Sequence, residues 1–431
     1  MKSVWQETSN LPKFEGLPRD MKTEVLIIGG GITGILCAYM LQKSGIPYIL
    51  AEAETICSGV TKNTTAKVTS QHGLIYDKII NKYGEELAEQ YLTANLIALR
   101  KYRELCLDID CDFEEKSSYV YSLDNRDIIE REINALSKLG FKSELVTDTD
   151  LPFEIAAAIK FRNQAQFNPL KFISSISKEL NIYEHTRVLE IKGNVAITTR
   201  GKITAEKIIV ATHFPFINKH GSYFLKMYQN RSYVIALENA PKIDGMYVDE
   251  NEYGLSFREY NGLLLLGGGS HRTGKQGGNY NELRAFAKEH FKDAKEKYHF
   301  ATQDCITLDS IPYIGKYSKN TDNMFVATGF NKWGMTSAMV SAMIICDLVN
   351  DKKNLYSEVF SPSRSILHPK LISNAFESAV NLLTPTTKRC SHLGCALKWN
   401  RAEHTWDCPC HGSRFTKDGE LIDNPATKGF K

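Results

Sequence analysis

Residues 24–54 read EVLIIGGGITGILCAYMLQKSGIPYILAEAE, and this stretch decides the fold that we expect. A short apolar run precedes a glycine-rich turn, and an amphipathic segment and a second apolar run follow it. Strand, turn, helix and strand in this order form a βαβ unit, in which the two strands are parallel. The sequence therefore predicts an α/β protein with a Rossmann-like domain at its start.

Three glycines of the turn, Gly29, Gly31 and Gly34, have the spacing G-x-G-x-x-G. The first permits a tight turn, the second lets backbone approach a pyrophosphate, and the third lets the helix pack closely on the strand. Phosphates would lie at the helix N-terminus, where free N–H groups favour negative charge. Glu52, eighteen positions after Gly34, can accept hydrogen bonds from the ribose hydroxyls of an adenosine. Such a turn can also serve packing alone, but the strand, the helix and the acid together indicate a dinucleotide site.

Length and composition set the broad class of the protein. A chain of 431 residues is long enough for two or three folding units. Its 42% hydrophobic and 24% charged residues are typical of a soluble protein, and a net charge of +3 indicates neither nucleic acid nor an anionic membrane as partner. The N-terminal segment is too polar for a secretion signal, and the apolar run 335–349 is too short to span a membrane and predicts a buried helix. Six of the ten cysteines are scattered, as in reduced proteins, so we expect a cytoplasmic location.

The other four cysteines lie between positions 390 and 410, in the motifs CSHLGC (390–395) and CPCHGS (408–413). Each motif supplies one Cys and one His, and this set can hold a [2Fe–2S] cluster in which one iron takes two thiolates and the other two imidazoles. Zinc is the alternative, since it also accepts two Cys and two His, although a zinc finger normally pairs Cys with Cys and His with His. The predicted ligands are Cys390, His392, Cys408 and His411.

Several segments beyond the first motif carry a family resemblance. They are the polar loop ICSGVTKNTTAKVTSQHG (56–73), RVLEI (187–191), KIIVATH (207–213), DSIPYIG (309–315) and ATGFNKWGMTSAMVSAMI (327–344). Together with the glycine turn they resemble the D-amino-acid oxidase-like family of FAD-dependent oxidoreductases, and in particular a subgroup fused to Rieske domains. The resemblance covers nearly the whole chain and implies FAD and a Rieske [2Fe–2S] cluster as cofactors.

The resemblance also implies which residues bind FAD. Lys332 follows a strand and a glycine turn and precedes a long helix, so it would stabilise the negative charge that reduction places on the flavin. A solvated surface lysine is the alternative for Lys332. The residues expected around FAD are Gly29, Gly31, Ile32, Thr33, Gly34, Glu52, Ala53, Thr64, Thr65, Ala66, Val188, Ala211, Thr212, Gly315, Gly329, Lys332, Trp333, Gly334, Met335 and Thr336.

For the C-terminal motifs, the Rieske resemblance implies a disulfide between Cys395 and Cys410. It also implies that the hydroxyl of Ser413 donates to a cluster sulfur and that residues 424–426 cover the cluster. One departure is evident, because Rieske domains usually place several strands before the first ligand motif and only residues 383–389 are present here. A module this small would need its cluster and disulfide in place of a large core.

We expect three parts in the chain. Residues 20–75, 150–217 and 305–350 form the FAD-binding domain, and 76–149 and 218–304 form a mixed α+β substrate domain over the flavin. Residues 351–385 are a linker and 386–431 a small Rieske-type β module. Candidate substrate contacts are Arg231, Tyr233, His271 and Arg272. Arg231 could clamp a carboxylate with two hydrogen bonds, or it could belong to a structural ion pair.

These motifs predict an oxidoreductase in which FAD takes a hydride from a small organic substrate, an amine or an amino acid, and passes single electrons to the cluster. Gly267–Gly269 follow an apolar strand but no helix follows them at once, so a second, nicotinamide site is not indicated. The alternatives are a reductase that serves a partner protein and a redox sensor without catalysis. The sequence leaves the substrate, the final electron acceptor and the oligomeric state open.

Overall fold

The computed structural model describes residues 2–217, 220–365 and 368–430. Its first sheet contains the predicted βαβ unit, in which β1 (Met21–Ile28) and β2 (Tyr48–Ala51) are parallel neighbours joined by α2 (Ile32–Lys43). The strand order is β16-β17-β10-β1-β2-β7, and the β8–β9 hairpin extends from β10. The other strands of this sheet are β7 (Ile182–Tyr183), β8 (Val188–Lys192), β9 (Val195–Thr198), β10 (Lys202–Val210), β16 (Tyr313–Lys316) and β17 (Met324–Thr328).

Both faces of the first sheet are buried, as a run of consecutive apolar residues predicts. Val25 and Ile27 point into the core that contains α2 and α9 (Gly334–Val349), whereas Leu26 and Ile28 point into a second core on the opposite face. Helix α9 is formed by the apolar run predicted to be a buried helix, and it packs beside α2.

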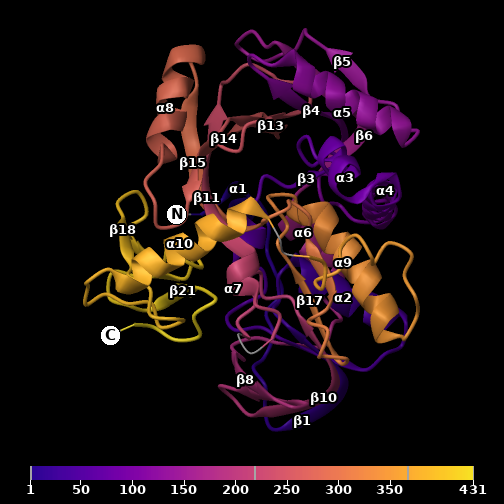
Figure 1. The fold of residues 1–431 in the computed structure, drawn as a ribbon, viewed down its shortest axis with the longest axis vertical. Coiled ribbons are helices and arrows are strands. Elements are labelled where there is room, and N and C mark those ends of the chain that lie inside the picture. The colour runs from indigo at the N-terminus through magenta and orange to yellow at the C-terminus, as the bar shows by residue number, and fades with distance from the viewer. Residues whose placement is uncertain (1, 218–219, 366–367, 431) are drawn as a thin grey trace.

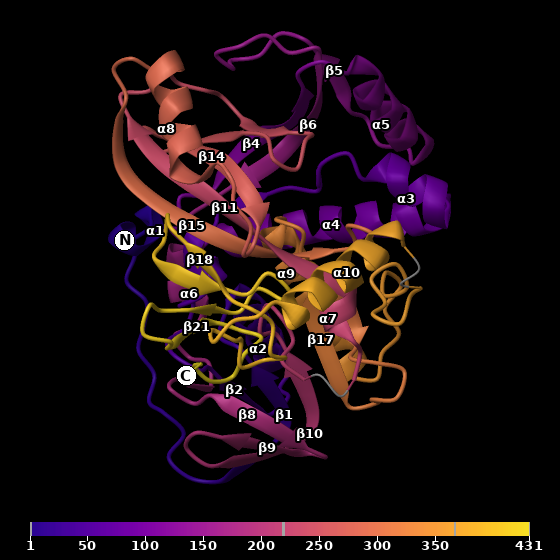
Figure 2. The same cartoon turned by 60° about the vertical axis from the view of Figure 1, so that its left-hand side comes forward.

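The second sheet is largely antiparallel and forms the upper part of the molecule in Figures 1 and 2. Its order is β15-β11-β14-β13-β12-β4-β6-β3, with β5 on β6. Its strands are β3 (Lys67–Val68), β4 (Glu114–Ser122), β5 (Glu144–Val146), β6 (Ala157–Gln166), β11 (Met227–Glu238), β12 (Met246–Asp249), β13 (Ser256–Tyr260), β14 (Leu263–Arg272) and β15 (Lys295–Thr307). The sequence predicts that residues 150–217, which include β6, belong to the FAD-binding domain, whereas antiparallel pairing with β4 along most of its length places β6 in this sheet.

Helices surround the two sheets. α8 (Asn279–His290) covers the outer face of the second sheet, where Leu283 packs with Tyr233 and Ile235. The N-terminus of α3 is capped by the buried carboxylate of Glu132, which accepts hydrogen bonds from the backbone N–H groups of Tyr76 and Asp77. The remaining helices are α1 (Val4–Thr8), α3 (Tyr76–Tyr83), α4 (Glu85–Cys106), α5 (Arg126–Lys138), α6 (Pro169–Ile176), α7 (Tyr223–Lys226) and the short 3₁₀ turn at Val60–Asn63.

The C-terminal module lies beside β11 and β15 in both ribbon views, and α10 (Pro369–Leu383) leads into it (Figures 1 and 2). Its antiparallel strands β18 (Lys398–Asn400), β19 (Thr405–Asp407), β20 (Arg414–Phe415) and β21 (Leu421–Asp423) all follow the first Cys/His motif. The buried core of the module consists of Cys390, Cys395, Leu397, Cys408, Cys410, Phe415 and Ala426. Cysteines thus supply much of this core, as the short sequence before the first motif led us to expect.

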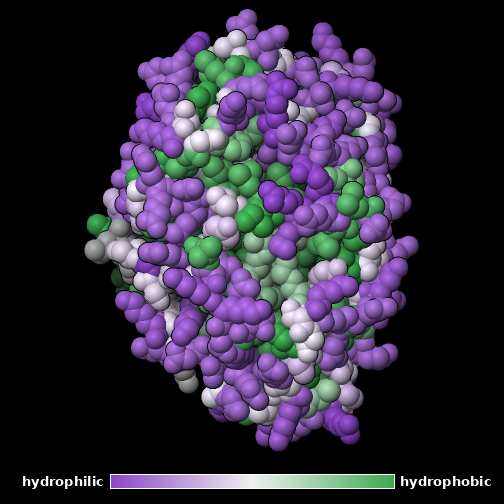
Figure 3. All heavy atoms as spheres, turned by 90° about the vertical axis from the view of Figure 1, so that its right-hand side faces the viewer, coloured by the Kyte–Doolittle hydropathy of each residue, from purple (hydrophilic) through white to green (hydrophobic). Residues whose placement is uncertain are grey.

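Hydrophilic side chains cover much of one face of the molecule (Figure 3). Figure 3 shows one face of the molecule, on which hydrophobic residues appear in a broken central band between hydrophilic ones. Within the described ranges, no helix combines the length and the apolar character needed to cross a bilayer.

Candidate functional site

The glycine turn has the close packing that its spacing predicts. Gly29 has a φ of 107°, a value in the region that favours glycine. A Cβ on Gly34 would lie 1.9 Å from the carbonyl oxygen of Gly29, so only glycine lets α2 start this close to β1. The carboxylate of Glu52 accepts hydrogen bonds from the N–H groups of Gly30, at 2.6 Å, and Glu54, at 2.9 Å. Burial raises the pKa of Glu52, although these two hydrogen bonds lower it in part.

A cavity of about 550 Å³ begins at this turn and extends between the two sheets. Most of the residues expected around FAD line it: Gly29, Gly31, Ile32, Thr33, Glu52, Ala53, Thr64, Thr65, Val188, Ala211, Thr212, Gly329, Lys332, Trp333, Gly334 and Met335. The other four are placed elsewhere. Gly34 packs under the turn, Ala66 and Thr336 lie just behind the wall, and Gly315 lies in β16, where the nearest atom to an added Cβ belongs to Pro362.

The far end of the cavity carries groups that the motifs did not reveal. The ring of His72 stacks on Trp333 at 5.2 Å between centroids, and its nitrogens contact the hydroxyls of Tyr91 and Thr336. Burial lowers the pKa of His72 to about 3, so the ring is neutral at pH 7. The side chain of Lys67 also lines the cavity, and burial lowers its pKa to about 7.

Lys332 lies in the turn between β17 and α9, as expected. Its Nζ donates to the carbonyl oxygen of Glu252, at 3.1 Å, and to the hydroxyl of Ser270, at 3.3 Å. Burial lowers the pKa of Lys332, and the nearby carboxylates of Asp304 and Glu252 oppose this effect. The lysine is therefore held against the second sheet, and the alternative of a solvated surface lysine does not describe it.

Of the four predicted substrate contacts, Tyr233 is among the residues that line the cavity, and Arg231, His271 and Arg272 are not. The guanidinium of Arg231 pairs with both carboxylate oxygens of Glu403 in the C-terminal module. Arg272 donates to the carbonyl of Pro409, and the Nε2 of His271 contacts the hydroxyl of Tyr233. Alternate residues of a strand point to opposite faces, so Ser232 and Val234 line the cavity while the side chain of Arg231 points away from it. For Arg231 the structure thus shows an ion pair, which was the alternative to a substrate clamp.

The two Cys/His motifs form matching loops. In each loop the glycine N–H donates to the carbonyl of the first cysteine, Gly394 to Cys390 and Gly412 to Cys408, both at 2.9 Å. The loops are joined by the expected disulfide between Cys395 and Cys410. The rings of His392 and His411 lie edge to face with centroids 5.0 Å apart.

The loops bring the four predicted ligands together. Contact with the thiol of Cys408 lowers the pKa of Cys390 to about 7, and the same contact raises that of Cys408. Burial lowers the pKa of His392 to about 4 and that of His411 to about 3, and neutral imidazole is the form that binds metal.

A [2Fe–2S] cluster fits these residues. Both ring nitrogens of the buried His411 have no hydrogen-bond partner among the described residues, which is costly unless another group binds there. Ser413 accepts a hydrogen bond from the N–H of Ala426, at 3.0 Å, and its hydroxyl also contacts the sulfur of Cys390. Thiolates on one side, imidazoles on the other and a hydroxyl beside one sulfur are what such a cluster requires.

The cluster loops are seated directly on the second sheet. Gln229 of β11 donates to the carbonyl of His411 at 2.6 Å, and Gln303 of β15 donates to that of Gly412 at 2.8 Å. A Cβ on Gly412 would lie 2.6 Å from the side chain of Gln229, so the contact is close. The position of the loops is thus set by buried amides of the flavin-side part of the chain.

The module also forms part of the cavity wall. Residues 422–424 and 426–427, from the segment predicted to cover the cluster, line the cavity. Asn424 donates to the carbonyls of Thr212 and Phe214 at the end of β10, both at 2.6 Å. One segment therefore contacts the cluster loop on one side and faces the cavity on the other.

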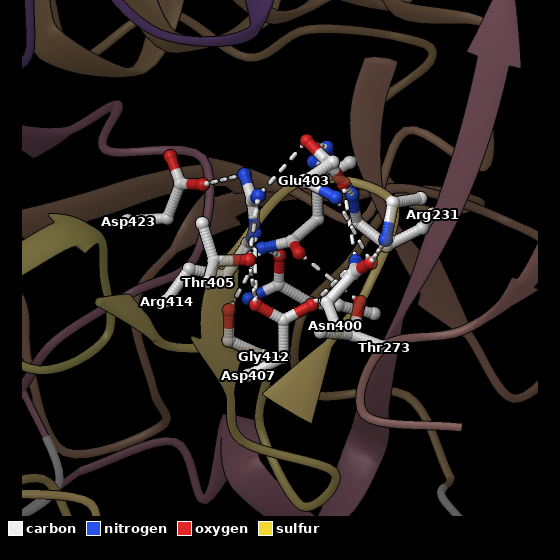
Figure 4. Close-up of polar contacts among 12 residues, drawn as sticks. Arg231, Thr273, Asn400, Glu403, Thr405, Asp407, Gly412, Arg414 and Asp423 are labelled. Atoms are coloured by element: carbon white, nitrogen blue, oxygen red, sulfur yellow. Dashed lines mark hydrogen bonds and ion pairs between the residues drawn. The ribbon is translucent and has the colours of Figure 1, made fainter. Parts of the chain in front are cut away.

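A buried group of charges holds the module in place (Figure 4). Glu403 lies between Arg231 of β11 and Arg414 of β20, and Arg414 also contacts Asp407 and Asp423. Burial by itself would raise the pKa of Glu403, but the two guanidinium groups lower it to about 2. Sequence alone could not pair Arg231 with Glu403, because they are 172 positions apart.

The comparisons with known proteins agree with this geometry. The family model described as FAD dependent oxidoreductase matches residues 24–348, and that of the Rieske [2Fe-2S] domain matches residues 381–431. A curated relative from Bacillus subtilis (strain 168), named as the Rieske 2Fe-2S iron-sulfur protein YhfW, is 37% identical over 494 aligned positions, which cover 100% of this chain and 97% of that protein.

Solved structures show the same fold at low sequence identity. Glycine oxidase from Geobacillus kaustophilus has a TM-score of 0.67 at 19% identity, over 80% of this chain and 99% of its own. L-proline dehydrogenase from P. horikoshii has a TM-score of 0.67 at 19% identity, over 81% of this chain and 98% of its own.

Proposed function

This chain belongs to the FAD-dependent oxidoreductase family and carries a Rieske [2Fe–2S] domain, and from that premise we propose that it oxidises a small organic substrate, an amine or an amino acid, and passes the electrons one at a time from FAD to the cluster. The single observation that carries the proposal is the shared wall. Residues 422–424 and 426–427 line the FAD cavity, and the N–H of Ala426 bonds to Ser413 beside the cluster ligands.

The residues of the cavity have distinct tasks in this proposal. The turn at Gly29–Gly34 and the carboxylate of Glu52 would hold the dinucleotide part of FAD, and Lys332 would place its positive charge near the isoalloxazine ring of FAD. The ring of His72, which stacks on Trp333 and is neutral at pH 7, would form part of the cavity wall beside the flavin. When bound, FAD accepts two electrons from an organic substrate and releases them singly, which matches the one-electron capacity of the cluster.

The glycine oxidase and L-proline dehydrogenase structures support an amine or amino acid as substrate, since their names state amino-acid substrates. A partner protein would then accept electrons from the cluster. His392 lies in the loop of residues 390–395, where Leu393 is 40% exposed, so this loop offers a route to such a partner.

The test is an anaerobic titration of the holoenzyme with amines and amino acids, followed by flavin absorbance and by EPR of the reduced cluster. We expect flavin bleaching and a rhombic cluster signal in the same reaction. In Cys408→Ser the flavin should still bleach while the cluster signal disappears. Rapid reduction by NADH in place of these substrates would favour a reductase, and no reduction by any of them would contradict the proposed oxidation.

A further inference from the structure

The part of the cavity wall formed by β11 and β15, which we call the roof, contains a carboxylate that has no protein partner. Asp304 lies in β15 and lines the cavity, and among the described residues no hydrogen bond or ion pair reaches its oxygens. Two other acids of this wall are already engaged: Asp249 accepts from the N–H of Asn251, and Glu252 accepts from the side chains of Tyr228 and Asn230. A partly buried carboxylate that faces a cavity and has no protein partner is available to a ligand.

The side chains beside Asp304 are polar, and they face the cavity as Asp304 does. Thr302 lies two residues before Asp304 in β15, so the two side chains point to the same face of the sheet. Ser232 of β11 is paired with Thr302, and both Ser232 and Thr302 line the cavity. The hydroxyl of Ser232 lies 3.0 Å from that of Ser270. Burial raises the pKa of Asp304 to about 6, with opposing effects of Lys332 and Arg231, so the carboxylate is ionised at pH 7. This part of the roof is suited to a small polar cation.

An unpaired arginine that could clamp a substrate carboxylate is missing from the cavity lining that the structure describes. Among the described residues that line the cavity the arginine is Arg187, which is paired with Glu54 at 2.7 Å beside the dinucleotide end. Arg231 is directed away and occupied by Glu403. The lysines that line the cavity are Lys67, Lys78, Lys332 and Lys370, and none of them belongs to β11 or β15. Lys332 donates to the hydroxyl of Ser270 and Lys67 to that of Thr65. A carboxylate beside Asp304 would meet a like charge without a bidentate partner.

We infer that the substrate is an amine that carries no carboxylate beside its amino group, and that Asp304 binds its ammonium group. The inference rests on the proposed function and narrows its substrate class. In the overall reaction the α-carbon loses a hydrogen with its electron pair, which reduces FAD, and the ammonium nitrogen releases one proton to water. The C–N single bond becomes the C=N bond of an iminium ion, and water then hydrolyses this product to a carbonyl compound and an amine or ammonia.

Two inert probes of equal shape test the binding site without turnover. tert-Butylammonium has no hydrogen on its α-carbon and cannot be oxidised, and pivalate carries a carboxylate in place of its ammonium group. Titrated into the holoenzyme, tert-butylammonium should perturb the flavin spectrum while pivalate should bind at least 10-fold more weakly. Tighter binding of pivalate, or equal binding of the two, would overturn the inference.

The variant Asp304→Asn keeps the shape of the side chain and removes its charge. Loss of a charge-assisted contact should raise the Kd for tert-butylammonium by about 10- to 100-fold, with FAD and iron contents unchanged. Asp322→Asn, at an exposed ion pair with Lys316, is the matched control and should leave this Kd unchanged. An unaltered Kd in Asp304→Asn would refute the role of Asp304.

Oxidisable pairs separate this inference from the proposed function. Isobutylamine and valine differ only by the α-carboxylate, and anaerobic flavin bleaching by isobutylamine alone is the expected result. Bleaching by valine alone would leave the proposed oxidation intact and overturn the inference. Bleaching by neither, together with selective binding of tert-butylammonium, would keep the cation site and contradict the proposed amine oxidation.

Discussion

The variant Glu403→Gln should release the Rieske module from the flavin-side part of the chain. Glu403 is 15% exposed and accepts from Arg231 and Arg414, which are 3% and 7% exposed. The lowering of its pKa from 4.5 to about 2 corresponds to about 3 kcal/mol in favour of the ionised form. Removal of one partner of a buried ion pair costs a similar amount, about 3–5 kcal/mol. Most of this loss comes from Arg231, which is left without a carboxylate partner, because Arg414 remains paired with Asp407 and Asp423.

The pH window follows from the sign of this change. Because the pKa is lowered in the folded protein, the stabilisation is complete above about pH 4.5 and is lost as pH falls toward 2. At pH 7 the variant therefore loses all of it, and 3 kcal/mol weakens docking by about 100-fold.

Two assays measure the weaker docking of the module in Glu403→Gln. Anaerobic stopped-flow should show slower electron transfer from reduced flavin to the cluster, while flavin reduction by substrate keeps its rate. Protease cleavage within residues 368–385, which precede the module, should become faster. Glu420→Gln, an exposed position of the same module, is the control and should behave like the wild type. Wild-type electron transfer together with wild-type protease resistance in Glu403→Gln would refute the reasoning.

Three other changes have defined outcomes. Gly34→Ala should yield protein without FAD, as measured by absorbance, since the added Cβ would meet the carbonyl oxygen of Gly29 at 1.9 Å. Cys395→Ser should lower the temperature at which the cluster absorbance is lost, because the bond to Cys410 closes a loop of about 15 residues and such a bond contributes about 3 kcal/mol. Binding of tert-butylammonium should weaken about tenfold per pH unit below pH 6, as the carboxylate of Asp304 takes up a proton that burial favours.

Each of these three has a simple check. Gly45→Ala adds a Cβ in open space and should keep FAD, at a cost of about 1 kcal/mol for its positive φ. Cluster loss at the wild-type temperature in Cys395→Ser would show that the disulfide does not support the module. A pH profile shared by wild type and Asp304→Asn would assign the titration to another group.

Local sequence patterns were enough to predict the two cofactor motifs and the buried helix. The spacing of Gly29, Gly31 and Gly34 can be read directly because turn and helix packing act within a few residues, and the same holds for the cluster ligands of each loop. The apolar run that forms α9 likewise predicts that this helix is buried.

Which side chains face the cavity depends on how the strands pair and could not be predicted from the sequence. Arg231 and Ser232 are neighbours in sequence, yet the alternation of a strand sends one to the Rieske module and the other to the cavity, and sequence did not show which face was which. Likewise, the pairing of β15 with β11 places Asp304 in the cavity wall. The packing of the C-terminal module on β11 makes Glu403 the partner of Arg231. Contacts between residues far apart in the chain depend on the packing of whole sheets, and no local pattern encodes that packing.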